Sequence, residues 1–241
     1  MRDLEHVALL QDPARRALYE YVVAQQRDVG RNEAAEAVGL QRTLTAFHLD
    51  RLAAAGLLEV SYRRLSGRSG PGAGRPAKLY RRATSEWSVS VPPRDYGGAA
   101  HVLADAIERS GTEAALFAAA HEAGVSAGRE LEVGEARPKT QTPTAETDRP
   151  DPEPLAVAFE RLIQHLDQRG YQPSRDGHSV RLLNCPFGTL AQRYPVVACG
   201  MNLAMLQGVL EGAGLEVGCE ARMDARPGAC CVTVISKTNK N

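Results

Sequence analysis

Five cysteines carry the most specific chemistry in this chain of 241 residues. Cys185 and Cys199 lie within the segment NCPFGTLAQRYPVVACGMN, and Cys230 and Cys231 are adjacent in PGACCVTV. Cys219 lies between these two segments. Thiolates are ligands of zinc and of iron–sulfur clusters, and they react with oxidants. The gaps of 13, 19 and 10 residues are too long for a zinc knuckle, whose paired ligands are about two to four residues apart. A shared site must therefore draw its ligands from separate elements.

The composition predicts a cytoplasmic protein with an ordinary hydrophobic core. Hydrophobic residues make up 43% of the chain and charged residues 24%. The first residues, MRDLEHVALL, contain acids where a secretory signal needs a basic start, and no run approaches the roughly 18 apolar residues of a membrane span. Structural disulfides are disfavoured in the cytoplasm. The cysteines thus indicate metal ligation or redox chemistry, the alternative being buried apolar thiols.

The formal net charge of zero hides an asymmetry along the chain. Residues 1–82 carry 14 Lys and Arg against 9 Asp and Glu, whereas the remainder carries 15 against 20. A basic N-terminal part joined to an acidic remainder is typical of a nucleic-acid-binding domain with a separate sensing or assembly domain. Chance is the alternative for a difference of this size.

The basic part is predicted to contain a helix-turn-helix. A helix over 3–25 restarts at Asp12-Pro13, and GRNEAAEAVGL predicts a short helix that ends at Gly39. The next segment, QRTLTAFHLDRLAAAGLLEV, predicts an amphipathic helix that Gly56 closes. We assign to its apolar face Leu44, Phe47, His48, Leu52 and Ala55. Two helices joined by a glycine turn form this motif.

A basic hairpin is predicted directly after the second helix. Two β-like segments, 57–63 and 77–82, enclose a tip rich in Gly, Ser and Pro, and residues 61–82 contain seven Lys and Arg and no acid. Such a hairpin is typical of the wing of a winged helix, which places cations on the DNA backbone. We therefore expect DNA contacts, rather than a merely solvated surface, from Arg31, Gln41, Arg42, Thr43, Thr45, His48, Arg51, Arg63, Arg64, Arg68, Arg75 and Lys78.

The whole chain is predicted to be α+β, with four segments. They are a winged helix-turn-helix over 1–84, Ala-rich central helices over 85–132, a linker over 133–153, and an α+β sensor domain over 154–241. The small residues of 85–132 suit either a dimer seam or a helix pair in the core. In the sensor domain we expect a helix over 154–169, a hairpin at Asp176-Gly177, a helix in ACGMNLAMLQGVLEGAG and strands in LEVGCEARM and CCVTVIS.

The adjacent Cys230 and Cys231 fall within the last of these strands. Successive side chains of a strand point to opposite faces, so the two thiols are expected to share one centre only if a bulge intervenes. Val232 and Val234 are expected on the face of Cys230.

Two parts of the chain resemble known regulators. The first 82 residues resemble the winged helix-turn-helix of ArsR-type regulators, with GRPAKLYR as the returning wing strand. CPF, a Cys before a helix, and Cys-x-apolar-x-apolar in the last strand resemble SufR-like regulators. This resemblance implies a homodimeric DNA-binding repressor, not an enzyme, that holds an iron–sulfur cluster and controls genes for cluster assembly. The implied ligands are Cys185, Cys199 and Cys230, with Cys231 as a substitute or a fourth thiolate.

The chain also departs from that family pattern, and alternatives stay open. Gly188 stands where an aromatic residue or His often follows CPF, and the four evenly spaced cysteines of some members are absent, which leaves the cluster type open. A zinc or thiol-redox regulator without a cluster is one alternative, and a domain that binds a small ligand or only dimerises is another. A thiol enzyme is disfavoured because the chain has no Cys-x-x-Cys and no nucleophile elbow.

Overall fold

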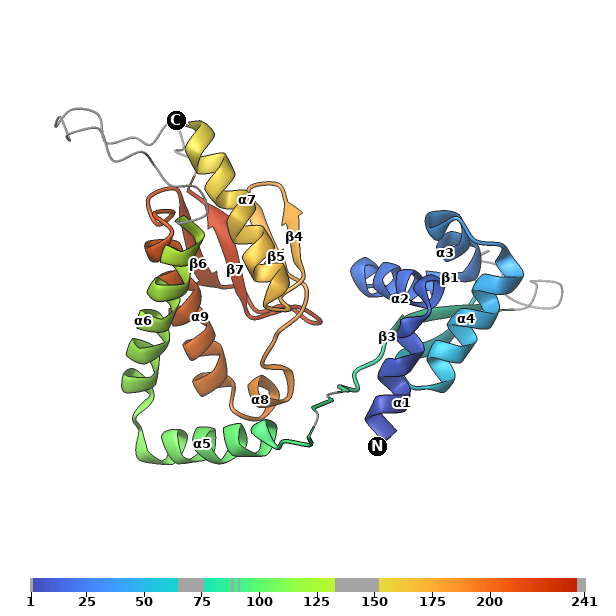
Figure 1. Cartoon of the computed structure of the whole chain (residues 1–241), viewed down its shortest axis with the longest axis horizontal. Coiled ribbons are helices and arrows are strands. Elements are labelled where there is room, and N and C mark those ends of the chain that lie inside the picture. The colour runs from blue at the N-terminus through green and yellow to red at the C-terminus, as the bar shows by residue number, and fades with distance from the viewer. Residues whose placement is uncertain (1, 65–75, 88, 91, 133–151, 238–241) are drawn as a thin grey trace. The chain divides into compact units, whose positions relative to one another are not determined.

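The computed structural model describes residues 2–64, 76–87, 89–90, 92–132 and 152–237. The chain is mixed α+β and divides into two compact units, Met1–Arg94 and Asp95–Asn241 (Figure 1). Each unit has its own small antiparallel sheet. Three sequence predictions concern residues outside the described ranges: the DNA contacts of Arg68 and Arg75, and nearly all of the linker.

The first unit places its helices where the capping residues predicted them. Its helices are α1 (Arg2–Ala8), η1 (Leu9–Gln11), α2 (Pro13–Gln25), α3 (Arg31–Val38) and α4 (Arg42–Ala54). The Asp12 carboxylate accepts a hydrogen bond from the backbone N–H of Arg15 at 3.0 Å, which caps α2. Gly39 ends α3 with a φ of 71°, a left-handed conformation that side chains disfavour. The turn between α3 and α4 is therefore short.

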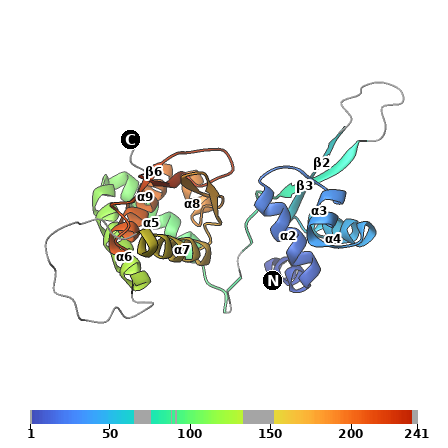
Figure 2. The same cartoon turned by 90° about the horizontal axis from the view of Figure 1, so that it is seen from above.

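The sheet of the first unit is built around a long hairpin. Its strands are β1 (Val29–Gly30), β2 (Leu58–Arg63) and β3 (Ala77–Arg82), in the order β1-β3-β2. In the β2–β3 register, Leu58 pairs with Arg82 and Arg63 with Ala77. Figure 2 shows β2 and β3 projecting beyond α3 and α4. The core beneath them contains Leu18, Val22, Leu49, Leu52 and Tyr80.

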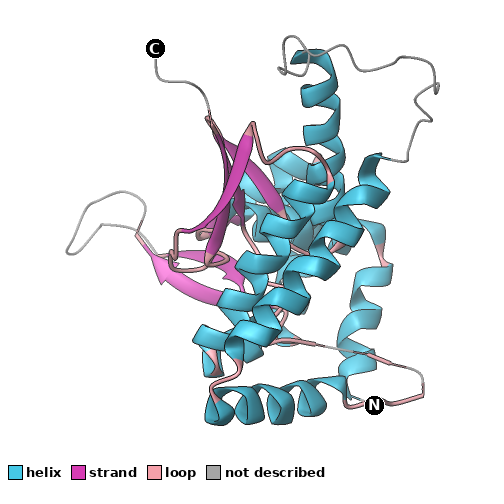
Figure 3. Cartoon of the chain, turned by 90° about the vertical axis from the view of Figure 1, so that its left-hand side faces the viewer, coloured by secondary structure: helices cyan, strands magenta, loops and turns pink. Residues whose placement is uncertain are grey.

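The second unit covers one face of a four-stranded sheet with helices. Its elements are α5 (Tyr96–Ser110), α6 (Glu113–Glu132), α7 (Pro152–Gln168), β4 (Pro173–Asp176), β5 (Ser179–Leu182), α8 (Gly188–Arg193), α9 (Pro195–Gly212), β6 (Cys219–Met223) and β7 (Val232–Ser236). The strand order is β4-β5-β7-β6, antiparallel throughout. Figure 3 shows the strands of this unit on one side of its helices. In the β4–β5 hairpin, Asp176 pairs with Ser179, so the turn lies where Asp176-Gly177 predicted it.

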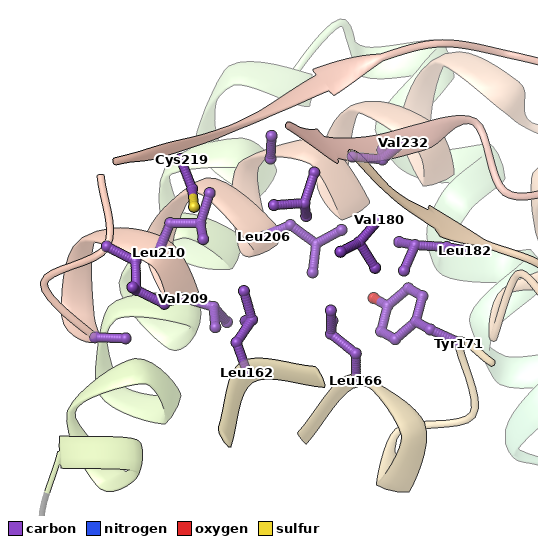
Figure 4. Packing of buried hydrophobic residues seen from close by; sticks show 14 of the residues in the cluster. Leu162, Leu166, Tyr171, Val180, Leu182, Leu206, Val209, Leu210, Cys219 and Val232 are labelled. Atoms are coloured by element: carbon purple, nitrogen blue, oxygen red, sulfur yellow. The ribbon is translucent and has the colours of Figure 1, made fainter. Parts of the chain in front are cut away.

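The core of the second unit lies between this sheet and the helices α7 and α9. Leu162 and Leu166 of α7 point toward Val180 and Leu182 of β5, as Figure 4 shows. Leu206 and its neighbours on α9 complete this cluster. Alternation along the strands sends apolar side chains inward and polar side chains outward, as expected for a sheet with one solvated face.

Helices α6 and α9 pack with their backbones in contact. A Cβ built on Gly208 would lie 2.1 Å from the carbonyl oxygen of His121, and one on Gly124 would lie 2.1 Å from that of Met205. Gly128 and Gly212 make equivalent approaches, so two glycines on each helix interlock. Of the connector predicted over 85–132, residues 95–132 belong to the second unit, where α6 forms a helix pair with α9, and residues 85–94 belong to the first unit.

Candidate functional site

The start of α4 carries exposed polar residues, as the sequence predicted for a DNA-reading helix. Gln41 is the N-cap residue, and Arg42 and Thr43 occupy the first turn with exposed side chains. Arg51 is exposed two turns further along the helix. Within the described residues, neither Arg42 nor Arg51 forms an ion pair, so both guanidinium groups keep their full charge available for a partner.

Two predicted DNA contacts on α4 are buried instead. Thr45 has 0% of its surface exposed and His48 has 6%, because both side chains face α2 and the sheet rather than solvent. The structure therefore removes Thr45 and His48 from the surface that could meet DNA. Their atoms Oγ1 and Nδ1 have no hydrogen-bond partner in the described part of the chain.

Conversely, two residues assigned to the buried face of α4 are exposed. Leu44 is 42% exposed and Phe47 is 55% exposed. The guanidinium carbon of Arg51 lies 6.0 Å from the centre of the Phe47 ring, within cation–π range. The exposed face of α4 thus combines apolar and cationic side chains. The spacing of Leu44, Phe47 and Leu52 suggested a common buried face, but only Leu52 of these three is in the core.

Asp50 binds two of the predicted DNA-contacting cations. Its carboxylate accepts hydrogen bonds from Arg31 Nη2 at 3.2 Å, Lys78 Nζ at 2.6 Å and the Tyr80 hydroxyl at 2.5 Å. These partners come from α3 and β3, so Asp50 on α4 joins the helix pair to the base of the hairpin. Burial alone would raise the pKa of the Asp50 carboxyl, but the hydrogen bonds from Lys78 and Tyr80 outweigh it and hold the pKa below its usual value.

The pKa of Tyr80 responds in the opposite direction. Burial, followed by the hydrogen bond to Asp50, raises the pKa of Tyr80 to about 12, so this hydroxyl remains a donor at every physiological pH. The charges of Arg31 and Lys78 are partly neutralised within this cluster. Both residues therefore position the hairpin, and their predicted contacts with DNA remain predictions.

The hairpin retains uncompensated charge at the far end of β2. Arg63 is its last residue and Arg64 follows it, and both are exposed. Arg81, by contrast, pairs with Glu59 at 2.7 Å across the hairpin. No acidic side chain of the described residues pairs with Arg63 or Arg64, so these two arginines are the hairpin's strongest candidates for phosphate contacts.

In the second unit, the thiols of Cys185, Cys230 and Cys231 lie together. Cys185 lies in the turn after β5, and Cys230 and Cys231 lie immediately before β7. The backbone N–H of Cys230 donates to the carbonyl of Leu182 at 2.8 Å, which holds the two turns side by side. The Cys230 thiol hydrogen-bonds with both Cys185 and Cys231.

The position of β7 corrects the prediction for the adjacent cysteines. The last strand begins at Val232 rather than at Cys230, and the chain bends at Cys231. The alternation of a regular strand does not apply to these two residues, so both thiols can reach the same place. The bend therefore replaces the bulge that was expected to be necessary for the two thiols to share one centre.

Two buried polar side chains complete the thiol site. The Asn202 amide on α9 donates to the sulfur of Cys230 at 3.2 Å, and its oxygen accepts from the Tyr171 hydroxyl at 2.6 Å. Asn202 is fully buried and Tyr171 nearly so, with 0% and 2% of their surfaces exposed. The sequence analysis assigned neither residue to a site, although a polar Asn on the buried face of an apolar helix was the available signal.

Cys230 and Tyr171 favour their protonated forms. A hydrogen bond from Cys185 lowers the pKa of the Cys230 thiol, but the hydrogen bond to Cys231 and burial outweigh it, so the net pKa lies above the usual value. Burial, together with the nearby thiols of Cys230 and Cys185, also raises the pKa of Tyr171. Tyr171 is therefore a permanent donor that fixes the orientation of the Asn202 amide.

The remaining cysteines lie in different surroundings. Cys219 opens β6 and packs in the core beside Leu210 (Figure 4), where burial raises its pKa. Cys199 is half-buried on α9, one turn before Asn202, and the hydrogen bonds that shift the pKa of Cys230 come from Cys185, Cys231 and the backbone of Val232. Its role as a ligand stays a prediction.

The donor set suits a soft metal, but the described side chains are not arranged around one. Three thiols are the ligands that iron–sulfur clusters and zinc prefer. Among the described residues, however, no group of three His, Cys, Asp or Glu side chains has the geometry to hold a metal ion. Cys185, Cys230 and Cys231 thus fit such a group by chemistry, and a bound group would replace the hydrogen bonds among them.

A surface groove of about 570 Å³ lies elsewhere on the second unit, between α6, α9 and β6. His121 and Glu211 approach each other to 3.2 Å at its edge, and Glu216, Arg222 and Lys237 add further charge. Ligand pockets are mostly apolar and enclosed. This open, charged groove gives the small-ligand alternative little support.

Comparisons with known proteins leave the family of the chain open. No protein-family model, no curated protein and no solved structure matches it. In the described part of the chain, every helix is too short or too polar to cross a lipid bilayer.

Proposed function

We propose that the chain is a DNA-binding transcriptional regulator whose first unit is a winged helix-turn-helix. In this proposal α4 enters the major groove with Gln41, Arg42 and Thr43 toward base edges, and the β2–β3 hairpin is the wing. The observation that carries the proposal is that Arg42 and Arg51 on α4 and Arg63 and Arg64 on the hairpin are exposed and form no ion pair with any described residue. Such cations, on two elements of one small unit, suit the phosphates on either side of a groove.

The proposal extends to the second unit as a sensor built on Cys185, Cys230 and Cys231. A cluster or zinc ion bound there would supply thiolate coordination that changes with oxidation or metal supply. Asn202 would orient Cys230 through its amide N–H, and Tyr171 would hold that amide in place. A homodimeric repressor that acts in the cytoplasm on paired half-sites is the form that the resemblance to SufR-like regulators implies.

A thiol-based regulator without a metal is the second candidate. It is favoured by the hydrogen bonds that already link Cys185, Cys230 and Cys231, and by the absence of Cys199 from that cluster among the described residues. Anaerobic purification followed by an absorption spectrum and iron, sulfide and zinc analysis distinguishes the two. Equal amounts of iron and sulfide in the wild-type protein, and their loss in Cys185→Ser, support the cluster. A wild-type protein without metal supports the thiol regulator.

The DNA-binding proposal is tested by the salt dependence of binding to duplex DNA. We expect the logarithm of the binding constant to fall linearly with the logarithm of salt concentration, with a slope of about −0.9 for each phosphate contacted. The double variant Arg63→Ala/Arg64→Ala should reduce the steepness of this slope by about two. Arg109→Ala is the matched control, since Arg109 pairs with Asp105 on α5 of the second unit. Salt-independent binding, or equal slopes for all three proteins, would refute the proposal.

A further inference from the structure

Helix α4 buries two polar side chains and exposes two large apolar ones. It buries the polar residues Thr45 and His48, whereas Leu44 and Phe47 are 42% and 55% exposed. Leu44, Phe47 and Arg51 follow a spacing of three and four residues, so they lie along one face of the helix. Two apolar side chains are therefore exposed together on this face, while Leu49 and Leu52 remain in the core.

Packing of Leu49 and Leu52 in the core sets the orientation of α4, but this orientation has an energetic cost. Burial of a Leu or Phe side chain is among the largest single contributions to stability, and a buried polar atom without a partner opposes folding. At Leu44 and Phe47 the first unit loses part of the stabilisation that full burial would give. At Thr45 Oγ1 and His48 Nδ1 it bears the cost of buried polar atoms, because neither atom has a hydrogen-bond partner within the described residues. The exposed apolar pair lies beside Arg51, which forms no ion pair with any described residue, and this combination is better explained by a molecule that binds there.

The charge around the pair identifies the kind of molecule. Arg51 stands one turn after Phe47, and its guanidinium carbon lies 6.0 Å from the centre of the Phe47 ring, whereas Arg42 stands two residues before Leu44 in the first turn of the helix. An apolar protein surface would strip water from the Arg51 guanidinium without compensation. Duplex DNA supplies phosphates for the arginines, and its major groove contains one apolar feature, the 5-methyl group of thymine.

We propose that Leu44 and Phe47 read thymine methyl groups, so that the preferred duplex contains T·A pairs opposite the middle of α4. This inference rests on the proposed function and adds to it the base that is read and the residues that read it. Phe47 makes the larger contact because it is the more exposed of the two and because Arg51 restrains its ring. Arg51 then reaches the adjacent phosphate while the ring lies against the methyl group.

The test uses thymine and uracil, which differ only by that methyl group. Full-length protein first selects its preferred duplex from a random library. Binding of the selected duplex is then compared with that of a copy in which each thymine in turn is replaced by deoxyuridine. Loss of one buried methyl contact should weaken binding of the wild-type protein about fourfold at the contacted positions. Phe47→Ala should bind the thymine duplex about tenfold more weakly and lose most of the discrimination between thymine and uracil.

A matched control and a conservative variant isolate the role of the ring. Leu4→Ala removes a side chain of α1 that is also 55% exposed, and it should leave the thymine-to-uracil ratio unchanged. Phe47→Leu keeps an apolar group and should retain part of the ratio. Because the uracil substitutions act on the DNA, the wild-type arm of the experiment does not depend on whether any variant folds.

Each unfavourable outcome has a distinct meaning. Salt-dependent binding with equal affinity for thymine and uracil at every position would overturn this inference and leave the proposed function standing. Absence of salt-dependent binding to any duplex would overturn both. If Phe47→Ala instead converts a dimer to a monomer in size-exclusion chromatography, the exposed pair belongs to an interface between two copies of the chain, and the inference is wrong.

Discussion

The interlocked glycines of α6 and α9 allow a stability change to be worked out from the structure. Gly208→Ala adds one methyl group at a point where it would lie 2.1 Å from the carbonyl oxygen of His121 and 2.9 Å from the backbone nitrogen of Val125. Real Cβ atoms essentially never approach other atoms closer than 3.0 Å, so the two helices must separate by about 0.9 Å. The obstructing atoms belong to the backbone, and no side-chain rotation relieves the contact.

Two effects of opposite sign set the magnitude. Overpacking of a core costs about 1–3 kcal/mol and occasionally more, and a backbone obstruction places this substitution at the upper end of that range. Replacing Gly by Ala inside a helix returns up to about 1 kcal/mol. The expected result is a loss of about 2 kcal/mol in the free energy of unfolding of the second unit. That loss corresponds to a melting temperature lower by about 4–8 °C.

Circular dichroism during thermal and urea unfolding measures this change. Gly97→Ala is the matched control, because Gly97 lies in the first turn of α5 with nothing within 4 Å of the added methyl group. The control should leave stability unchanged or raise it by up to about 1 kcal/mol, so the two Gly-to-Ala changes are expected to have opposite signs. If Gly208→Ala unfolds at or above the wild-type temperature, the backbones of α6 and α9 are not in contact at this glycine.

Two further predictions concern the charged and thiol clusters. Asp50→Asn should destabilise the first unit at neutral pH and flatten its acid dependence. A carboxyl with a depressed pKa stabilises the fold above its unfolded-state pKa and loses that contribution as pH falls through the folded-state pKa. Melting curves from about pH 7 to pH 2 test this, and parallel curves for the two proteins would contradict it. Asn202→Leu removes the amide donor to Cys230 and should raise the pH midpoint of Cys230 alkylation, followed by mass spectrometry, by about 0.5–1 unit. The midpoint of Cys219, whose pKa is raised by burial, should not move, and an unchanged Cys230 midpoint would exclude a role for the amide.

Several helix ends and one hairpin turn were predictable because local chemistry sets them. The side chain of Asp12 caps α2, and Gly39 and Gly56 adopt the left-handed conformation that ends a helix or its following turn. The turn at Asp176-Gly177 follows from the same principle. In each case the signal comes from the residue at the boundary and its immediate neighbours, and no knowledge of the packing is needed.

The orientation of α4 could not be predicted from its sequence. Leu44, Phe47, Leu49 and Leu52 are spread around the helix, so no single apolar face is defined by their spacing. The two core leucines and the sheet determine the orientation, and it places Thr45 inside and Phe47 outside. Tertiary packing decides such a case, because helical periodicity gives no preference among faces of similar hydrophobicity.

Only part of the thiol site was predictable from the sequence, because two of its features depend on long-range packing. Cys185, Cys230 and Cys231 were identified by residue type, but the bend at Cys231 and the amide of Asn202 depend on long-range contacts. Asn202 lies on α9, and α9 cannot slide along α6 without driving glycine backbones into carbonyl oxygens. The close packing of α9 against α6 therefore fixes the position of the amide that donates to Cys230, and no local signal in the sequence specifies that packing.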